Sequence, residues 1–503
     1  MNGDNSRRAK AIMIQGTMSN VGKSWITAGL CRVFHQDGYR VAPFKSQNMA
    51  LNSFVTSDGL EMGRAQVMQA EAAGVLPCVQ MNPILLKPTS EVGSQVIVNG
   101  ESIGTMKAAD YFRMKTQLIP EIQKAYDFLS ERFDIIVLEG AGSPAEINLK
   151  QQDIVNMGMA QLVSAPVLLV GDIDRGGVFA SLYGTMALLE RDEQAFVKGM
   201  LINKFRGDRT ILQPGLTQLE TLVQTPVVGV LPYLDLHLDE EDSLSRDFRS
   251  EYQAQGIDLA VIRFPRMANF TDFAPLEGID GVSVRYVTQV RELGRPDLVF
   301  LPGTKNTIGD LIWMRESGLE AAVKKMVSHG TPVFGICGGY QMLGERLSDP
   351  DHAEYGGVLD GMGLLPVCTT FTKEKIRKQT AGTFGTVSGI LSGISGLSFE
   401  GYEIHMGQSV VHAGEAFTRN RGNAINGICK GKVYGTYVHG IFDRESVRTA
   451  FLDALAQHKG VCLETNGLPD RKAYKESQYE SLAQAIRQHV NLKQVYNILE
   501  AGV

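Results

Sequence analysis

Short apolar, β-branched runs alternate with longer amphipathic stretches through the first half of the chain. This alternation is typical of a doubly wound α/β domain, in which helices connect the strands of a parallel sheet. The strands that it predicts are 11–15, 40–44, 134–139, 166–171, 199–203 and 227–231.

A polar segment separates this half from a second half with the same alternation. Residues 237–255 carry many charges and no glycine, so we expect a linker there. The pattern therefore predicts an α/β domain at 1–236 and another at 256–445. The strands expected in the second domain are 259–264, 282–287, 297–302, 332–336 and 433–439.

The pattern predicts a helical extension at the end of the chain, 446–503. Its apolar residues recur at spacings of three and four, which places them on one face of a helix. We interpret this face as a packing surface. The residues that form it are Tyr479, Leu482, Ile486 and Val490.

Composition and charge narrow the class of protein. Hydrophobic residues make up 44% of the 503 positions, and the net charge of -6 gives no electrostatic reason to expect nucleic acid as a partner. The polar start leads into too few apolar residues for a signal peptide, and no later run reaches the ~18 that a membrane span needs. We therefore expect a cytoplasmic protein that is not bound to a membrane.

The six cysteines contain no C-x-x-C pair, so a zinc or redox motif has no support. Disulfides are not expected in a cytoplasmic chain. We expect five of the cysteines to be small buried apolar residues, and only Cys337 has neighbours that indicate chemistry. The five are Cys31, Cys78, Cys368, Cys429 and Cys462.

A glycine-rich loop follows the first predicted strand and precedes an amphipathic helix. Backbone N–H groups in such a loop bind phosphate oxygens, a lysine adds a charge and a serine hydroxyl binds Mg²⁺. The loop has five residues between its glycines rather than four, and it resembles that of the dethiobiotin synthetase-like enzymes. A glycine turn without a ligand is the alternative. The predicted ATP-binding residues are Gly16, Thr17, Asn20, Gly22, Lys23 and Ser24.

Two further strand ends face this loop in a parallel sheet. Glu139 closes the buried strand 134–139, at the edge where such sheets bind ligands, so we expect it to bind Mg²⁺ together with Ser24. Asn203 and Lys204 close another strand, and in related enzymes such a pair borders the nucleotide base. An ordinary strand-end asparagine is an equally good interpretation.

A cysteine flanked by glycines lies between a strand and a helix in the second half. The run Gly335-Ile-Cys337-Gly338-Gly-Tyr-Gln341 is a nucleophile elbow and resembles that of class I glutamine amidotransferases. The N–H of Gly338 and the turn at Gly303 are the expected oxyanion donors, and Gln341 is an expected glutamine contact.

A late histidine is the expected base for this cysteine. His439 follows a strand-like run, and His405 is less well placed but could line the site. The related domains carry a glutamate two residues after the histidine, whereas this chain has Ile441. We therefore predict a Cys337–His439 dyad, without Asp443 as a third member.

Longer motifs make the resemblance specific. Across residues ~10–445 the chain resembles the cobyric acid synthase family of cobalamin-pathway amidotransferases. The motifs that carry this resemblance lie at 44–53, 138–149, 171–180, 203–208 and 401–407.

The resemblance implies a reaction. Such enzymes use ATP and L-glutamine to amidate the b, d, e and g carboxylates of adenosylcobyrinic acid a,c-diamide, a corrinoid, through an acyl phosphate. It leaves open whether the chain forms a homo-oligomer. Residues on the substrate side, for which a loop-stabilising role is the alternative, would be Lys45, Asn48, Glu146, Asp172, Asp174 and Arg175.

Two rival functions share part of this pattern. Cobyrinic acid a,c-diamide synthase has the same plan, but the block 45–50 argues against it. A partitioning ATPase would carry an extra lysine early in the phosphate loop, and residues 16–22 contain none.

Overall fold

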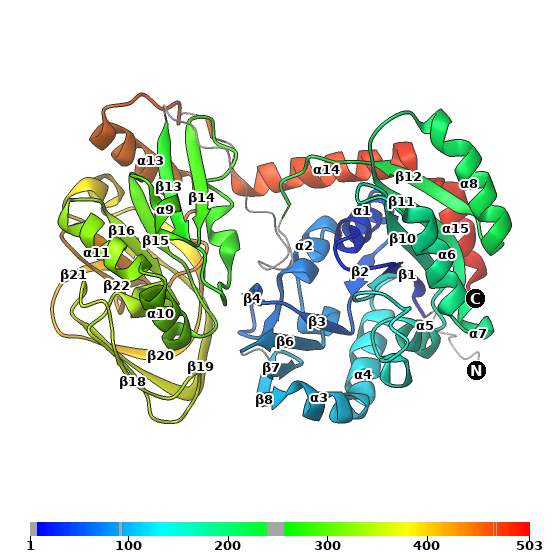
Figure 1. Ribbon diagram of the computed structural model, residues 1–503, viewed down its shortest axis with the longest axis horizontal. Helices are drawn as coiled ribbons and strands as arrows, with labels where there is room; N and C mark the ends of the chain where they lie inside the picture. Colours follow the sequence, from blue (N-terminus) through cyan, green and yellow to red (C-terminus); the bar gives the residue numbers. More distant parts are fainter. Residues whose placement is uncertain (1–7, 90–92, 239–255, 466, 469) are drawn as a thin grey trace, which may run out of the picture.

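The computed structural model describes residues 8–503, apart from 90–92, 239–255, 466 and 469. Two α/β halves lie side by side, and a long helix near the end of the chain runs from one to the other (Figure 1). The linker predicted at 237–255 falls almost entirely outside the described residues.

The N-terminal half is built on a six-stranded parallel sheet, in the order β12-β11-β10-β1-β9-β2. All six strands expected from the apolar runs are present, which confirms the doubly wound parallel sheet. Both faces are covered, so the strands read as continuous apolar runs rather than alternating ones. The strands are β1 (Lys10–Gly16), β2 (Val41–Phe44), β9 (Ile135–Glu139), β10 (Val167–Asp172), β11 (Val197–Phe205) and β12 (Val227–Pro232).

Helices cover both faces of this sheet. Met13 packs on one side with residues of α4, α5, α6 and α8. Ile12 and Ile14 pack on the other side with α1 and with helices from the end of the chain. The helices of this half are α1 (Lys23–Gln36), α2 (Arg64–Ala72), α3 (Ala108–Met114), α4 (Ile119–Ser130), α5 (Met157–Val163), α6 (Val178–Leu188), α7 (Arg191–Gln194) and α8 (Arg209–Val223), with 3-10 turns η1 (Val79–Met81), η2 (Lys115–Leu118) and η3 (Lys150–Gln152).

An insertion that the sequence pattern did not predict lies between β2 and β9. It forms a four-stranded sheet, β3-β6-β7-β8, and a two-stranded one, β4-β5. In Figure 1 these strands face the C-terminal half. They are β3 (Gln47–Met49), β4 (Ser53–Val55), β5 (Glu61–Gly63), β6 (Ile84–Pro88), β7 (Gly93–Val98) and β8 (Glu101–Lys107).

The C-terminal half is built on an 11-stranded mixed sheet, in the order β14-β13-β15-β16-β23-β22-β21-β19-β17-β18, with β20 paired to β19. The five strands predicted here form its parallel part. Those strands are β13 (Ile257–Ile262), β14 (Val282–Val287), β15 (Leu298–Leu301), β16 (Val333–Ile336) and β23 (Val433–Thr436).

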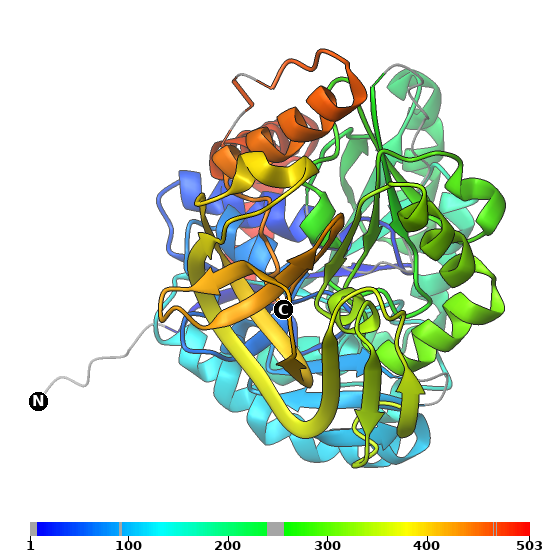
Figure 2. The same cartoon turned by 90° about the vertical axis from the view of Figure 1, so that its left-hand side faces the viewer.

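The rest of this half was not predicted as strand. The long pair β19–β20 lies in front of the N-terminal half when the molecule is turned by 90° (Figure 2). The remaining elements are β17 (Arg346–Asp349), β18 (Gly357–Asp360), β19 (Val367–Phe384), β20 (Ser398–Val411), β21 (Glu415–Asn420), β22 (Ile425–Lys430), α9 (Val290–Leu293), α10 (Thr307–Glu316), α11 (Leu319–Ser328), α12 (Gly338–Met342), η4 (Phe270–Phe273) and η5 (Ile390–Ile394).

The three helices at the end of the chain divide between the halves. α13 (Glu445–Lys459) packs on the C-terminal half, against β13 and η5. α14 (Arg471–His489) and α15 (Leu492–Ala501) return to the N-terminal half and pack on α1, β1 and β12 (Figure 1). The predicted apolar face of α14 is buried there, which confirms it as a packing surface.

Contacts between the halves are polar as well as apolar. The backbone N–H of Ser53 donates to the side chain of Asn269, and that of Phe270 donates to the side chain of Asn52. Val55 packs with Tyr402 and Ile404 in a small apolar cluster. These contacts join the β4 region to the loop after β13 and to β20.

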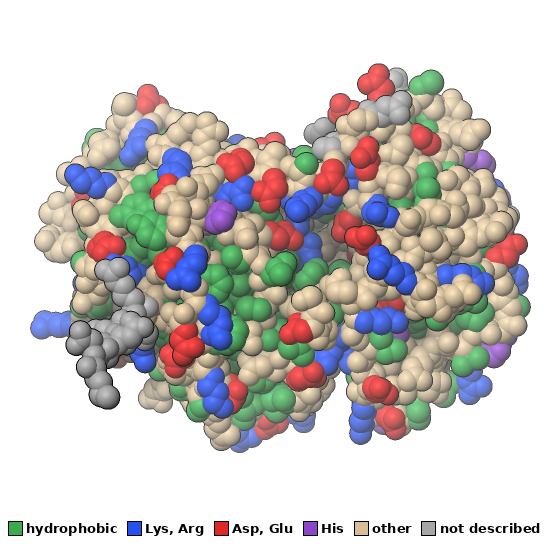
Figure 3. Space-filling view, turned by 180° about the vertical axis from the view of Figure 1, so that it is seen from behind, with side chains coloured by type: hydrophobic (Ala, Val, Ile, Leu, Met, Phe, Trp, Pro, Cys, Tyr) green, Lys and Arg blue, Asp and Glu red, His purple; other side chains and the backbone are tan. Residues whose placement is uncertain are grey.

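Surface features add two observations. Seen from behind, acidic and basic side chains are interspersed over the molecule (Figure 3). Within the described part of the chain, no helix is both long and apolar enough to cross a membrane.

The cysteine expectation was only partly right. Cys31 and Cys429 are buried, but Cys78 and Cys368 are half-buried and Cys462 is exposed. Cys462 follows α13 in a loop, where a short apolar residue has no core to join.

Replacing Ile486 tests the packing of α14. Its side chain is fully buried, and a Cβ on Gly29 of α1 would lie 2.8 Å from Ile486 Cγ1, so the two helices meet closely. We expect Ile486→Ala to lower the free energy of unfolding of the N-terminal half by about 2 to 5 kcal/mol. Urea unfolding followed by Trp25 fluorescence, in a Trp313→Phe background, measures this.

The matched control is Ile211→Ala, because Ile211 is 81% exposed on α8. We expect this control to change the free energy of unfolding by less than about 0.5 kcal/mol. Equal effects of the two substitutions would contradict the packing role of Ile486.

Candidate active sites

The glycine-rich loop lies between β1 and α1, and residues at the end of β11 donate hydrogen bonds to its backbone. Gly22 has a φ of 99°, and a Cβ there would overlap the Asn203 side chain. Asn203 Nδ2 donates to Val21 O at 2.8 Å, and Lys204 Nζ donates to Asn20 O at 2.7 Å. Glycine is therefore required at position 22 both by its conformation and by the close approach of Asn203.

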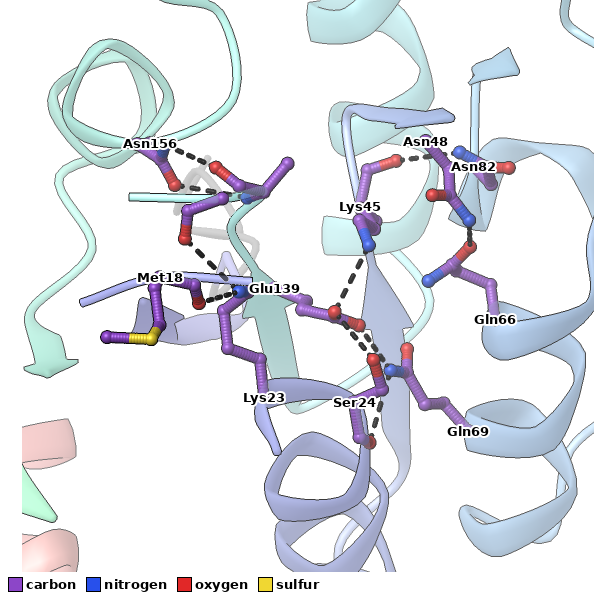
Figure 4. A network of polar contacts seen from close by, with 12 residues as sticks. Met18, Lys23, Ser24, Lys45, Asn48, Gln66, Gln69, Asn82, Glu139 and Asn156 are labelled. Carbon is purple, nitrogen blue, oxygen red and sulfur yellow. Dashed lines mark hydrogen bonds and ion pairs between the residues drawn. The ribbon is translucent and has the colours of Figure 1, made fainter. Parts of the chain in front are cut away.

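The ammonium of Lys23 lies inside this loop. It donates to Met18 O at 3.0 Å and to Gly142 O at 3.1 Å (Figure 4). The side chain is buried, and these two carbonyls hold its charge beside the loop backbone. The predicted loop residue Thr17 is also buried, and its hydroxyl has no hydrogen-bond partner among the described residues.

Glu139 is the centre of the polar network beside the loop. It is 1% exposed and accepts hydrogen bonds from Ser24 Oγ at 2.8 Å, Lys45 Nζ at 3.1 Å and Gln69 Nε2 at 2.6 Å (Figure 4). The donors come from α1, from the turn after β2 and from α2. The structure thus brings the two predicted metal ligands, Ser24 and Glu139, into direct contact.

This pair fits a magnesium ion. Mg²⁺ is usually held by one or two protein oxygens, with phosphates and waters in its other positions. A hydroxyl and a carboxylate in contact beside a phosphate loop provide those oxygens. No cluster of three or more His, Cys, Asp or Glu exists within the described ranges, so an all-protein metal cage has no support there.

The predicted substrate-side residues fall into two groups. Lys45 and Asn48 are buried, and Asn48 Nδ2 donates to Gln66 Oε1 at 3.0 Å. The others follow β9 and β10, where Asp172 is buried and paired with Lys204. Those that are exposed on loops are Glu146, Asp174 and Arg175.

The C-terminal half presents Cys337 on a sharp turn between β16 and α12. Cys337 has φ 51° and ψ -106°, a left-handed conformation that is costly for a residue other than glycine. The turn fits closely into its surroundings, because a Cβ on Gly339 would overlap Leu301 O. Cys337 Sγ lies 3.5 Å from Ile404 O.

His439 is oriented by a carboxylate that the sequence did not reveal. Its Nδ1 bonds to Asp272 Oδ2 at 2.7 Å, and Asp272 Oδ1 accepts from the N–H of Gly440 at 2.8 Å. The side chains of His439 and Asp272 are 1% and 2% exposed. The prediction of a dyad without an orienting carboxylate is therefore wrong, because Asp272 bonds to the ring of His439.

The reason for this error is distance along the chain. Asp272 lies in η4, 167 residues before His439, so a search for a carboxylate near the histidine could not find it. Its local sequence, Asn269-Phe-Thr-Asp272, mixes polar residues with a buried phenylalanine and gives no signal of an acid that orients a histidine. Asp443, the nearby acid, lies beside Gly440, with Oδ2 3.1 Å from where a Cβ on that glycine would lie.

Burial and neighbouring charge shift the pKa of His439 in opposite directions. Burial lowers the pKa of His439, but the Asp272 carboxylate and the neighbouring Cys337 outweigh it and raise the pKa to about 10. The other ring nitrogen, Nε2, has no hydrogen-bond partner among the described residues. A Cβ on Gly303 would lie 3.0 Å from His439 Cε1 and 3.8 Å from Cys337 Cβ, so the three residues meet at one point.

A small cavity opens at Cys337 and His439. Gly303, Gln341 and His405 line it, and a Cβ on Gly338 would lie 3.0 Å from the backbone N of Thr304 in the Gly303 turn. Gln341 is fixed by hydrogen bonds with the Thr307 and Tyr437 hydroxyls. The oxyanion and glutamine candidates predicted from the sequence thus surround the cysteine.

The N-terminal half contributes directly to this site. Lys87 of β6 lines the same cavity. Tyr402 stacks on the ring of His439 at 5.2 Å, and its hydroxyl donates to Ser53 O. Asn52 holds the backbone of Phe270, two residues before Asp272.

Comparison with known proteins agrees with this division. Residues 12–243 match the model of the CobQ/CobB/MinD/ParA nucleotide binding domain, and residues 258–447 match that of the CobB/CobQ-like glutamine amidotransferase domain. The chain is 57% identical to the cobyric acid synthase of Ruminiclostridium cellulolyticum, over 98% of each chain. It is also 57% identical to that of Lachnoclostridium phytofermentans, over 98% of this chain and 100% of the relative.

Removing the charge of Asp272 should change the titration of His439. In Asp272→Asn the main cause of the raised pKa is lost while burial remains, so we expect the pKa to fall from about 10 toward its ordinary value of 6.5. NMR titration of the histidine ring signals between pH 6 and 10 measures this, with His439→Gln to assign the signal.

Asp443→Asn is the control, and we expect it to leave His439 protonated up to about pH 10. An Asp272→Asn variant whose His439 signal still titrates near pH 10 would show that this carboxylate does not set the pKa.

Proposed function

The chain belongs to the cobyric acid synthase family and is a glutamine-dependent ligase, and from that premise we propose that it converts adenosylcobyrinic acid a,c-diamide to adenosylcobyric acid. Each cycle amidates one of the b, d, e and g carboxylates and consumes one ATP and one glutamine. The alternative, cobyrinic acid a,c-diamide synthase, has no comparable support among these relatives.

One observation supports the proposal above the others. A phosphate loop with its acidic partner Glu139 and a Cys–His–Asp triad occur in one chain, and Lys87 and Asn52 of the first half reach the second site. Activating a carboxylate and releasing ammonia are separate reactions, and a ligase that uses glutamine needs both.

The triad supports an amide hydrolysis step. His439 lies beside Cys337, and the sulfur of Cys337 attacks the side-chain amide carbon of glutamine. The N–H groups at Gly338 and in the Gly303 turn receive the oxyanion. His439 gives its proton to the departing nitrogen, and ammonia leaves. Water, activated by His439, then hydrolyses the thioester to glutamate.

The phosphate loop supports the activation step. A substrate carboxylate oxygen attacks the γ-phosphorus of ATP and ADP leaves, which gives an acyl phosphate. Ammonia then attacks the acyl carbon and inorganic phosphate leaves. Lys23 would stabilise the charge of the transferring phosphoryl group.

Magnesium would be held by Ser24 and Glu139, where it would neutralise phosphate charge. The Lys45 side chain ends at Glu139, so the substrate carboxylate is expected on this side of the loop. Asn203 and Lys204 brace the loop, and we propose that they border the nucleotide.

Replacing Cys337 with serine should separate the two reactions. We expect Cys337→Ser to abolish synthesis with glutamine and to retain it with high ammonium, since the cysteine only releases ammonia. Mass spectrometry of the corrinoid product counts the amides formed with each nitrogen source. If a folded variant also fails with ammonium, the two-site reaction is wrong.

Replacing Lys23 should stop synthesis with either nitrogen source. Loss of a charge on the transferring phosphate is expected to reduce kcat/KM on the order of 10²-fold or more. Lys124→Ala is the control, because Lys124 is exposed on α4 and pairs only with Glu121 in the described structure. Ammonium-dependent synthesis by Lys23→Ala at the rate of this control would exclude the role of the loop.

A further inference from the structure

Two side chains of opposite charge line the cavity at Cys337 and have no part in the chemistry above. Lys305 follows the Gly303 turn after β15, and Glu354 lies in the loop after β17. Lys305 is 8% exposed, and its ammonium makes no hydrogen bond or ion pair with any residue that the structure describes. A buried lysine without a partner is unusual, because burial removes the water that stabilises its charge.

Glu354 is held in place by its own loop. The carboxylate of Asp349 accepts backbone N–H groups from four consecutive residues, 353–356, at 2.7 to 2.9 Å, which fixes the loop. One oxygen of Glu354 accepts from the N–H of Thr307 at 2.6 Å, at the start of α10. This rigid support points to a functional position rather than to a solvated surface acid.

The other two lysines at this cavity share one carboxylate as a partner. Lys87 and Lys375 both pair with Glu61, which is buried between the two halves. Lys305 and Glu354 therefore remain as a positive and a negative group that attract each other without an ion pair within 4 Å among the described residues. Burial lowers the pKa of Lys305 and raises that of Glu354 to about 7, so each group gains from an added opposite charge.

We propose that Lys305 binds the α-carboxylate of L-glutamine and Glu354 binds its α-ammonium group, while Cys337 attacks the side-chain amide. This proposal rests on the glutaminase activity proposed above. L-Glutamine carries its two charges on one carbon and its reactive amide at the other end. A cavity with a cysteine and a separate pair of opposite charges is complementary to that arrangement.

The pair would make the site specific for an amino acid rather than for any amide. A site that contains buried charges rejects a ligand that leaves them unpaired, because the desolvation of each charge is then not compensated. Lys305 and Glu354 are thus specificity residues, distinct from Cys337 and His439, which perform the chemistry.

Two alkylating agents of Cys337 separate recognition from reactivity. 6-Diazo-5-oxo-L-norleucine carries both α groups of an amino acid, whereas iodoacetamide is a small neutral reagent that needs only a reactive thiol. In the full chain, we expect Lys305→Met and Glu354→Gln each to slow labelling by the amino-acid reagent 10- to 100-fold. Labelling by iodoacetamide should stay within about twofold. The KM for glutamine should rise in the same variants, with ammonium-dependent synthesis unchanged.

Charge-preserving and distant variants complete the experiment. Lys305→Arg and Glu354→Asp should recover most of the labelling by the amino-acid reagent. Lys459→Met and Glu320→Gln remove charges that are paired outside the cavity, and they should change neither reaction.

The outcomes distinguish the two proposals. If the unmodified chain neither hydrolyses glutamine nor reacts with the amino-acid reagent at Cys337, the proposed function fails. If the unmodified chain does both and the variants react normally with both reagents, the recognition role is overturned. If the variants slow the labelling of Cys337 by both reagents equally, the recognition role is also overturned. Lys305 and Glu354 would then affect only the reactivity of the Cys337 thiol.

Discussion

The structure of this molecule depends on buried carboxylates, each of which needs hydrogen-bond donors around it. An unpaired charge inside a protein costs several kcal/mol, so a buried acid is kept only where the fold supplies partners. Glu139, Glu61 and Asp272 each meet that requirement with groups from segments far apart in the chain. Glu139 assembles the phosphate site, Glu61 joins the two halves, and Asp272 orients the histidine of the triad.

Two of these acids, Glu139 and Asp272, are linked through one segment of the N-terminal half. Lys45, at its start, bonds to Glu139, and Asn52 and Ser53, at its end, contact the loop that carries Asp272. The same Ser53 accepts a hydrogen bond from Tyr402, which stacks on His439. The position of His439 therefore depends on a segment that begins beside the glycine-rich loop, so the two candidate sites are structurally connected.

What the sequence could predict was local. The phosphate loop and the cysteine elbow are strand–loop–helix units whose residues are adjacent, so their order alone indicates their geometry. Parallel strands were found because burial on both faces gives continuous apolar runs. By contrast, β7 and β8 are mixed in polarity and β19 has a largely polar middle, so their pairing could not be read from the apolar pattern.

The sequence did not reveal which residues far apart in the chain contact one another. Asp272 is remote from His439, and nothing near Lys87 indicates that it enters a cavity of the other half. Lys305 and Glu354 look like ordinary surface charges until the fold brings them to one cavity. Such residues are fixed by tertiary contacts, and a single sequence without its fold gives no distance between them.

The positions of α14 and α15 determine the order in which the two halves become complete during synthesis. The ribosome makes α1 and the central strands first, but the helices that cover their outer face follow the C-terminal half in the chain. Domains usually fold as units during synthesis, starting from the N-terminus. Here the nucleotide-binding half keeps an apolar face open until α14 and α15 have been made, so it becomes complete only after the C-terminal half. A prematurely terminated chain would thus carry exposed apolar surface that chaperones and proteases recognise.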